Sequence, residues 1–177
     1  MKTVEKLVEQ VGIARRHYLD QIKDCAESRA QWKPATEVWN IVENTEHLFW
    51  AEQGAIVGMW KTINAIREGK MPHTYESIHR NMPVEEIIKL TWKEKEEVPA
   101  IAAPRFGGPL PFWHHSLSSL QEVLYAFGRN LKDDELRIQA HPHPISGAMD
   151  FQQRLEFLIF HINRHREQVA RLIIEMK

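Results

Sequence analysis

One cysteine, no long apolar run and almost no net charge together exclude several classes of protein. Cys25 has no second cysteine to pair with, so the chain cannot form an internal disulfide. No run approaches eighteen apolar residues, and a transmembrane helix is therefore not expected. The opening MKTVEKLVEQ lacks the apolar region of a signal peptide. These absences predict a cytoplasmic protein without membrane association.

An excess of positive charge is also missing. The chain has 23 Lys and Arg against 24 Asp and Glu, for a formal net charge of -1, and no basic block stands out. A nucleic-acid partner is therefore not expected, since phosphate backbones are bound through basic surfaces. With 177 residues, 43% hydrophobic content and six Trp, the sequence is long and apolar enough for a packed core. We expect a single domain over residues 1–177.

Apolar residues recur every three or four positions in several long stretches, which is the spacing of one face of a helix. The pattern predicts four main helices and a short fifth one, at residues 3–29, 37–68, 83–92, 116–131 and about 150–176. No stretch shows a sustained alternation of apolar and polar residues, so no large sheet is expected. The predicted fold is all-α, an antiparallel four-helix bundle.

Residues 70–115 differ from the rest of the chain because prolines and glycines interrupt the helical pattern. This proline-rich irregular insertion ends in EEVPAIAAPRFGGPLPFWHH, which is too apolar for a free linker. A connection of this length in a compact domain often has a function, and it would suit a lid or wall over a site. In the later crossover at residues 132–146, the His-Pro steps at His141 and His143 predict an extended backbone.

Two histidines of the last predicted helix, His161 and His165, are four residues apart. Positions four apart differ by about 40° around a helix and lie roughly 6 Å apart along it, so both rings can reach one ion. Ile162 stands where a His-Glu-x-x-His zinc protease needs glutamate. Leu158 and Ile162 stand where a di-iron bundle needs acids. The pair alone also fits two half-buried histidines satisfied by neighbouring side chains, and a metal site needs a third ligand.

Small residues dominate one face of the predicted helix at 37–68. Ala51, Gly54 and Gly58 lie on this face together with His47. Each interior glycine costs about 1 kcal/mol relative to alanine, so a packing or site reason is expected, such as the close approach of another helix. His47 is then either a surface histidine or a residue that faces a close neighbour, and the pattern leaves both open.

The segments HPHPISGAMDFQQRLEFLIFHINRHREQVARL and WNIVENTEHLFWAE resemble the DinB superfamily of metal-binding four-helix proteins, and the resemblance spans most of the chain. It implies a three-His metal site made by His47, His161 and His165, with Gln168 completing an HxxxHxxQ pattern. The expected cofactor is a divalent ion such as zinc, nickel or iron. Three protein ligands leave a coordination position open, where an ion activates water or binds a thiolate.

The resemblance further implies a metal-dependent enzyme that acts on a small molecule, either as a thiol transferase that uses a low-molecular-weight thiol or as a hydrolase. Glu43, one turn before His47, is the candidate base for hydrolysis. Arg154 is the candidate for binding an acidic thiol. The alternative is a non-catalytic metal-binding or assembly and regulatory bundle. A fourth protein ligand, such as His143, would favour this alternative because it would close the site.

A homodimer is expected from the resemblance and from the aromatic content. Trp39, Trp50 and Trp60 all lie away from the centre of the apolar stripe of the predicted helix at 37–68. An isolated bundle has few places to bury so many indoles, so some are expected at an interface. The alternative is that the insertion at 70–115 folds back and covers them within one chain.

Overall fold

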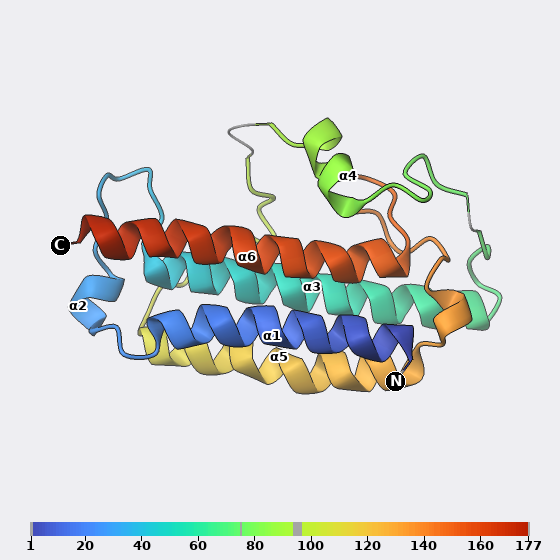
Figure 1. The fold of residues 1–177 in the computed structure, drawn as a ribbon, viewed down its shortest axis with the longest axis horizontal. Coiled ribbons are helices and arrows are strands. Elements are labelled where there is room, and N and C mark those ends of the chain that lie inside the picture. Colours follow the sequence, from blue (N-terminus) through green and yellow to red (C-terminus); the bar gives the residue numbers. More distant parts are fainter. Residues whose placement is uncertain (1, 75, 94–96, 177) are drawn as a thin grey trace.

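The fold is a bundle of four long helices, seen in a computed structural model that describes residues 2–74, 76–93 and 97–176. The long helices lie side by side (Figure 1), and they are α1 (Thr3–Ile22), α3 (Ile41–Arg67), α5 (Leu110–Asn130) and α6 (Phe151–Glu175). The short elements are α2 (Glu27–Ala30), α4 (Val84–Thr91) and the 3-10 helix η1 (Asp133–Glu135). The described ranges contain no strand, only two isolated β-bridges. The predicted all-α four-helix bundle is confirmed.

The four long helices run as two opposed pairs. Figure 1 shows α1 and α6 running in one direction and α3 and α5 in the other. The most extensive interfaces join α1 to α6 and α3 to α5, while α1–α5 and α3–α6 contacts complete the ring. The centre is filled by fully buried apolar side chains, among them Tyr18, Leu48, Phe127, Phe151 and Leu155. This arrangement makes α3 and α6, which carry the three candidate histidines, direct neighbours.

Two predicted boundaries at one end of the bundle are wrong. The first helix ends at Ile22 rather than residue 29, and the N–H of Cys25 closes a turn on the carbonyl of Ile22 at 3.1 Å. The chain then forms α2, where the carboxylate of Glu27 accepts the N–H of Leu110 at 3.1 Å. This contact caps α5, which begins six residues before the predicted start at Ser116 and has Pro111 in its first turn, where proline is tolerated.

The starts of the two histidine-bearing helices follow from capping boxes. Asn40 caps α3: its Oδ1 accepts the N–H of Glu43 at 2.8 Å, and the Glu43 carboxylate accepts the N–H of Asn40 at 2.9 Å. The predicted start at residue 37 is therefore wrong by four residues. Asp150 caps α6 through Gln153 in the same way, as expected. Because caps fix where each helix begins, they also fix the register of the histidines.

The insertion packs along the bundle at two places. α4 places Val84, Ile87 and Ile88 against Met149 and Phe157, which confirms the predicted short helix. Residues 75 and 94–96 of the insertion lie outside the described residues. The second anchor is the buried carboxylate of Glu46 on α3, which accepts backbone N–H groups from residues 105, 106 and 107 at 2.8–2.9 Å. Burial opposes the charge of this carboxylate, but the N–H donors hold the pKa of Glu46 below its usual value.

The structure shows half-buried side chains for the three tryptophans that were expected at a dimer interface, Trp39, Trp50 and Trp60. The guanidinium of Arg105 lies over the ring of Trp50 at 4.3 Å, and Trp60 packs edge-on against Phe127 at 5.5 Å. Trp39 lies 5.0 Å from the ring of His47. Each of these indoles therefore has a neighbour within its own chain, and the tryptophans do not by themselves require a dimer interface. The homodimer stays a prediction. Among the described helices, none is long and apolar enough to cross a membrane.

Candidate metal centre

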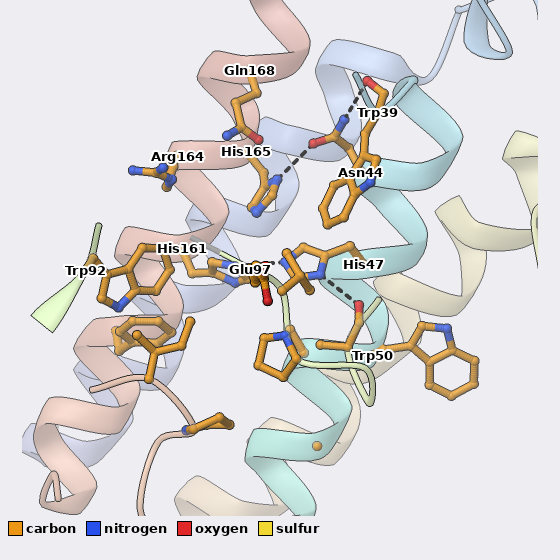
Figure 2. A pocket seen from close by; sticks show the side chains of 18 of the residues that line it. Trp39, Asn44, His47, Trp50, Trp92, Glu97, His161, Arg164, His165 and Gln168 are labelled. Atoms are coloured by element: carbon orange, nitrogen blue, oxygen red, sulfur yellow. Dashed lines mark hydrogen bonds between the residues drawn. The ribbon is translucent and has the colours of Figure 1, made fainter. Parts of the chain in front are cut away.

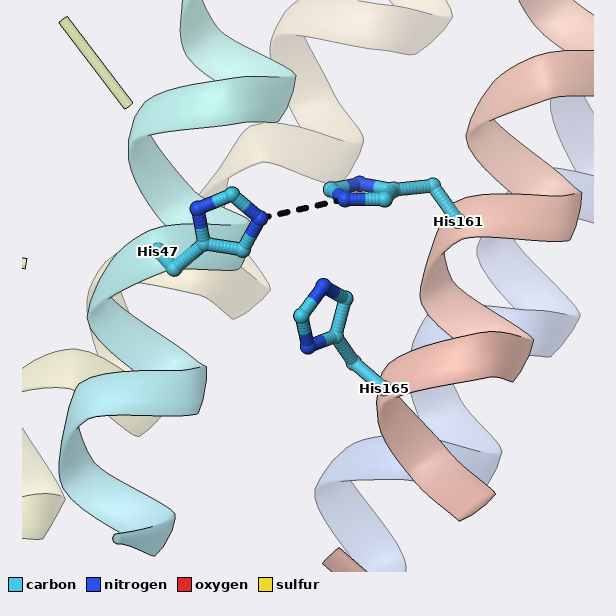
Figure 3. A group of neighbouring side chains, drawn as sticks. All are labelled: His47, His161 and His165. Atoms are coloured by element: carbon cyan, nitrogen blue, oxygen red, sulfur yellow. Dashed lines mark hydrogen bonds between the residues drawn. The ribbon is translucent and has the colours of Figure 1, made fainter. Parts of the chain in front are cut away.

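Three histidines from two helices meet in the interior of the bundle. Their ligand nitrogens all lie within 4.8 Å of one another (Figure 3), and each side chain is about 5% exposed or less. His47 comes from α3, whereas His161 and His165 project from adjacent turns of α6. The alternative of a surface position for His47 is therefore excluded. The structure brings together all three residues that the family resemblance indicated.

His47 is oriented by the insertion. Its Nδ1–H donates to the carbonyl oxygen of Ala102 at 2.8 Å. Because a carbonyl only accepts, Nδ1 carries the proton and Nε2 presents its lone pair to the other two rings. The segment that supplies this carbonyl is held on α3 by Glu46, one residue before His47 in the chain. The insertion thus sets the tautomer of one candidate ligand.

His165 is oriented by Asn44. The Nδ2 of Asn44 donates to the carbonyl oxygens of Asn40 at 2.8 Å and Trp39 at 3.3 Å, so its Oδ1 must point the other way. That Oδ1 accepts the Nδ1–H of His165 at 2.9 Å. The lone pair of His165 is consequently on Nε2. Such hydrogen bonds behind a ligand histidine fix its tautomer and make it a better electron donor.

His161 completes the cluster. Its Nε2 lies 3.1 Å from the Nε2 of His47, and its Nδ1 is buried without a partner among the residues that the structure describes. Since the Nε2 of His47 can only accept, the Nε2–H of His161 donates to it, and this proton lies between the two rings. Three nitrogens at tetrahedral positions around an ion stand roughly 3.4 Å apart. The 3.1 Å between His47 and His161 is close to this value, and all three ligand nitrogens lie within 4.8 Å of one another. The cluster can therefore hold one ion if the rings adjust and the His161 proton moves to Nδ1.

Burial keeps the cluster uncharged. Desolvation lowers the pKa of His47 to about 4. For His161 and His165, desolvation and then the neighbouring histidines lower the pKa values well below their usual range. All three imidazoles are therefore neutral at neutral pH, which is the state that binds a metal ion. The cluster itself contains no carboxylate among the described residues, so a bound divalent ion would keep its full charge.

The histidines border a cavity of about 1130 Å³, large enough for a small organic molecule. Figure 2 shows Trp39, Trp92, Arg164 and Gln168 around it, with Glu97 from the insertion. The small-residue face of α3 forms another wall. A Cβ on Gly54 would meet no described atom within 4 Å, so this glycine leaves cavity space open.

Gly58 has a different role on the same face. A Cβ there would lie 2.4 Å from the Nε2 of His141, so the glycine makes room for that ring. The expected close neighbour of this face is thus a histidine of the crossover rather than another helix. His141 and Arg154 both line the cavity.

The remaining sequence candidates fall in different places. Glu43 belongs to the α3 cap and forms an ion pair with Lys33 at 2.6 Å, and it does not line the cavity. Gln168 does line it. The Nδ1 of His143 accepts backbone N–H groups from residues 145 and 146 at 3.2 and 3.0 Å, so its proton is on Nε2. His143 does not join the cluster, and no other His, Cys, Asp or Glu of the described ranges adds a fourth ligand.

Sequence reasoning missed three contributors to the site. Asn44 precedes His47 by three positions, which is one helical turn, so its place beside the cluster was accessible from spacing. Glu97 carried no signal apart from its place in the insertion. The carbonyl of Ala102 carried none at all, because any residue there offers the same oxygen.

Comparisons with known proteins indicate the family and the fold. The family model of the DinB superfamily matches residues 10–169. YfiT from Bacillus subtilis, a probable metal-dependent hydrolase with an unusual four-helix bundle topology, is similar in structure, with a TM-score of 0.63 and 11% identity over 98% of this chain and 87% of that chain. A conserved protein from Enterococcus faecalis has a TM-score of 0.59 and 14% identity over 99% of both chains. No curated protein sequence matches the chain. At these identities, the structural likeness shows the fold.

Proposed function

The chain belongs to the DinB superfamily, and from this premise we propose that it is a metal-dependent enzyme for a small molecule, which it modifies by thiol transfer or hydrolysis. His47, His161 and His165 would hold a divalent ion such as zinc, nickel or iron. One observation carries the proposal: three neutral imidazoles converge beside a cavity of about 1130 Å³, and two of them have tautomers set by Ala102 and Asn44.

When bound, the ion would act as a Lewis acid that lowers the pKa of a coordinated water or thiol. The protein's own contribution is positioning. Ala102 and Asn44 hold the Nε2 atoms of His47 and His165 toward one point, so little reorganisation is needed when the ion enters. Trp39 and Trp92 line the surrounding cavity and give it apolar walls.

For the hydrolytic route, Glu97 replaces Glu43 as the candidate base. It is an exposed cavity residue on the same segment as Ala102, whereas Glu43 is held in the α3 cap. Glu97→Gln should abolish hydrolysis while metal content stays unchanged. It should leave thiol transfer largely intact, because a thiol that loses its proton to solvent needs no general base.

The first test is the metal content of protein purified without added metal, measured by mass spectrometry of the elements. We expect close to one ion per chain, and a much lower content in His47→Ala. A chain that binds no transition metal under any loading condition would refute the proposal. Loaded protein is then assayed for thiol conjugation and for hydrolysis of small esters and amides. Loaded protein that catalyses neither reaction would favour the non-catalytic alternative.

Two expectations from the sequence accompany the proposal: a homodimer and a cytoplasmic location. Light scattering across a dilution series tests the first, because a mass that stays near 20.8 kDa would show a monomer. Fractionation of the source cells tests the second.

A further inference from the structure

Arg154 on α6 is a buried cation that lines the cavity. Its side chain is only 3% exposed, and its Nη2 donates to the Nε2 of His141 at 2.8 Å. Its Nε and Nη1 have no hydrogen-bond partner within the described part of the chain, and no carboxylate there pairs with it. An arginine is normally buried only with an acid or several acceptors, since an unpaired buried charge is unfavourable.

His141 has a related deficiency. Arginine can only donate, so the Nε2 of His141 accepts and the proton of this neutral ring is on Nδ1. That Nδ1 is buried as well and has no partner among the described residues. Three N–H-bearing atoms of one contact pair, Nε and Nη1 of Arg154 and Nδ1 of His141, thus have no acceptor among the residues that the structure describes. Their common requirement is an oxygen-rich, negatively charged group.

The position of this pair is set by the bundle. Gly58 makes room for the His141 ring, where a Cβ would lie 2.4 Å from Nε2. Arg154 precedes His161 by seven residues, which is two helical turns, so the two residues share one side of α6 about 10.5 Å apart along its axis. Both line the same cavity. An anion held by Arg154 would therefore belong to a molecule that can also reach the histidine cluster.

We infer that Arg154 and His141 form a subsite for an oxyanion group, a carboxylate or a phosphate, on the small molecule that enters the cavity. The planar guanidinium suits this group. Nη2 has a second N–H besides the one bound to His141, and it can form a parallel pair with the N–H of Nε or of Nη1, which matches two oxygens of one anion. If the cavity binds the substrate, as the proposed function has it, the substrate carries its acidic group roughly two helical turns from the atom that reacts. This part of the inference rests on the proposed function. The subsite itself needs no metal.

The test compares hexanoate, hexyl phosphate and 1-hexanol as probes of one chain length. Binding to the protein as purified, and again after chelation, is measured by isothermal titration calorimetry. We expect at least one anion to bind about tenfold more tightly than 1-hexanol, a preference that survives chelation. The anion that binds more tightly identifies the acidic group. Equal binding of all three probes would overturn the inference, as would a preference that disappears on chelation, because the anion would then be binding the metal.

Two variants locate the preference. Arg154→Gln should abolish it, whereas Arg164→Gln, at another arginine of the same cavity, should retain it. The opposite pattern would assign the anion to Arg164 and refute the role of Arg154. Circular dichroism checks that both variants fold. If Arg154→Gln does not fold, the comparison of probes on the wild type still decides whether the subsite exists. Arg154→Lys then tests the residue. Lysine keeps the charge but lacks the planar guanidinium, so we expect a weaker preference for the anion. Metal content is measured separately, so the metal site and the anion subsite can be refuted independently.

Discussion

Replacement of Asn44 by alanine should weaken metal binding without touching a ligand. Asn44 holds the Nδ1–H of His165 at 2.9 Å, and its own orientation is fixed by the carbonyls of Asn40 and Trp39. In Asn44→Ala, the buried Nδ1 of His165 loses its acceptor, so the ring is free to change tautomer or rotate. Loss of such a partner behind a metal ligand typically costs 10- to 100-fold in affinity, or about 1.4–2.7 kcal/mol.

The assay is competition with a chromophoric chelator, which gives the affinity of the chain for zinc. Asn64→Ala is the matched control, because Asn64 is an exposed asparagine of the same helix. We expect Asn64→Ala to bind zinc like the wild type. The unfolding midpoint of each metal-free variant is measured separately, so that a general loss of stability is not mistaken for an effect on the site. An affinity of Asn44→Ala within twofold of the control would refute the role assigned to Asn44.

Three further predictions concern stability, measured as urea unfolding of metal-free protein. Gly54→Ala should stabilise the chain by up to about 1 kcal/mol, because alanine has the higher helix propensity. Gly58→Ala should destabilise the chain by about 1–3 kcal/mol, because the new Cβ would clash with His141. Equal effects of the two substitutions would contradict the packing described. Acidification should lower the free energy of unfolding between pH 6.5 and about 4, because His47 takes up a proton in the unfolded chain but stays neutral when buried. Over this pH range His47→Gln should lose about 3 kcal/mol less stability than the wild type, and an equal loss in both proteins would contradict the prediction. Glu46→Gln should cost about 2 kcal/mol by weakening the charge-assisted bonds to residues 105–107, and a neutral result would show that the anchor is dispensable.

Local patterns predicted the elements well but several of their ends poorly. Helical periodicity located the four long helices and α4, because the apolar face of a helix is written in spacing alone. The start of α6 was predicted at about residue 150, and Asp150 caps it, whereas the equally local capping box of Asn40 and Glu43 was overlooked at the start of α3. The start of α5 was missed because its cap, Glu27, lies 83 residues away in the chain. Two prolines just before Ser116 made the first turn look irregular, although proline is tolerated there.

What the sequence by itself determined about the site is the pairing of His161 and His165, since four residues along any helix place two side chains on one face. Spacing left His47 open, and only the family resemblance added it to the pair. The tertiary structure decided the rest: that Ala102 orients His47, that Asn44 orients His165, and that Arg154 is buried in the cavity with no acidic partner in the described ranges. The contact of Asn44 with His165 depends on how α3 packs against α6, whereas the contacts of His47 and Arg154 depend on the paths of the insertion and the crossover. Both are set by packing between distant segments, which no local pattern encodes.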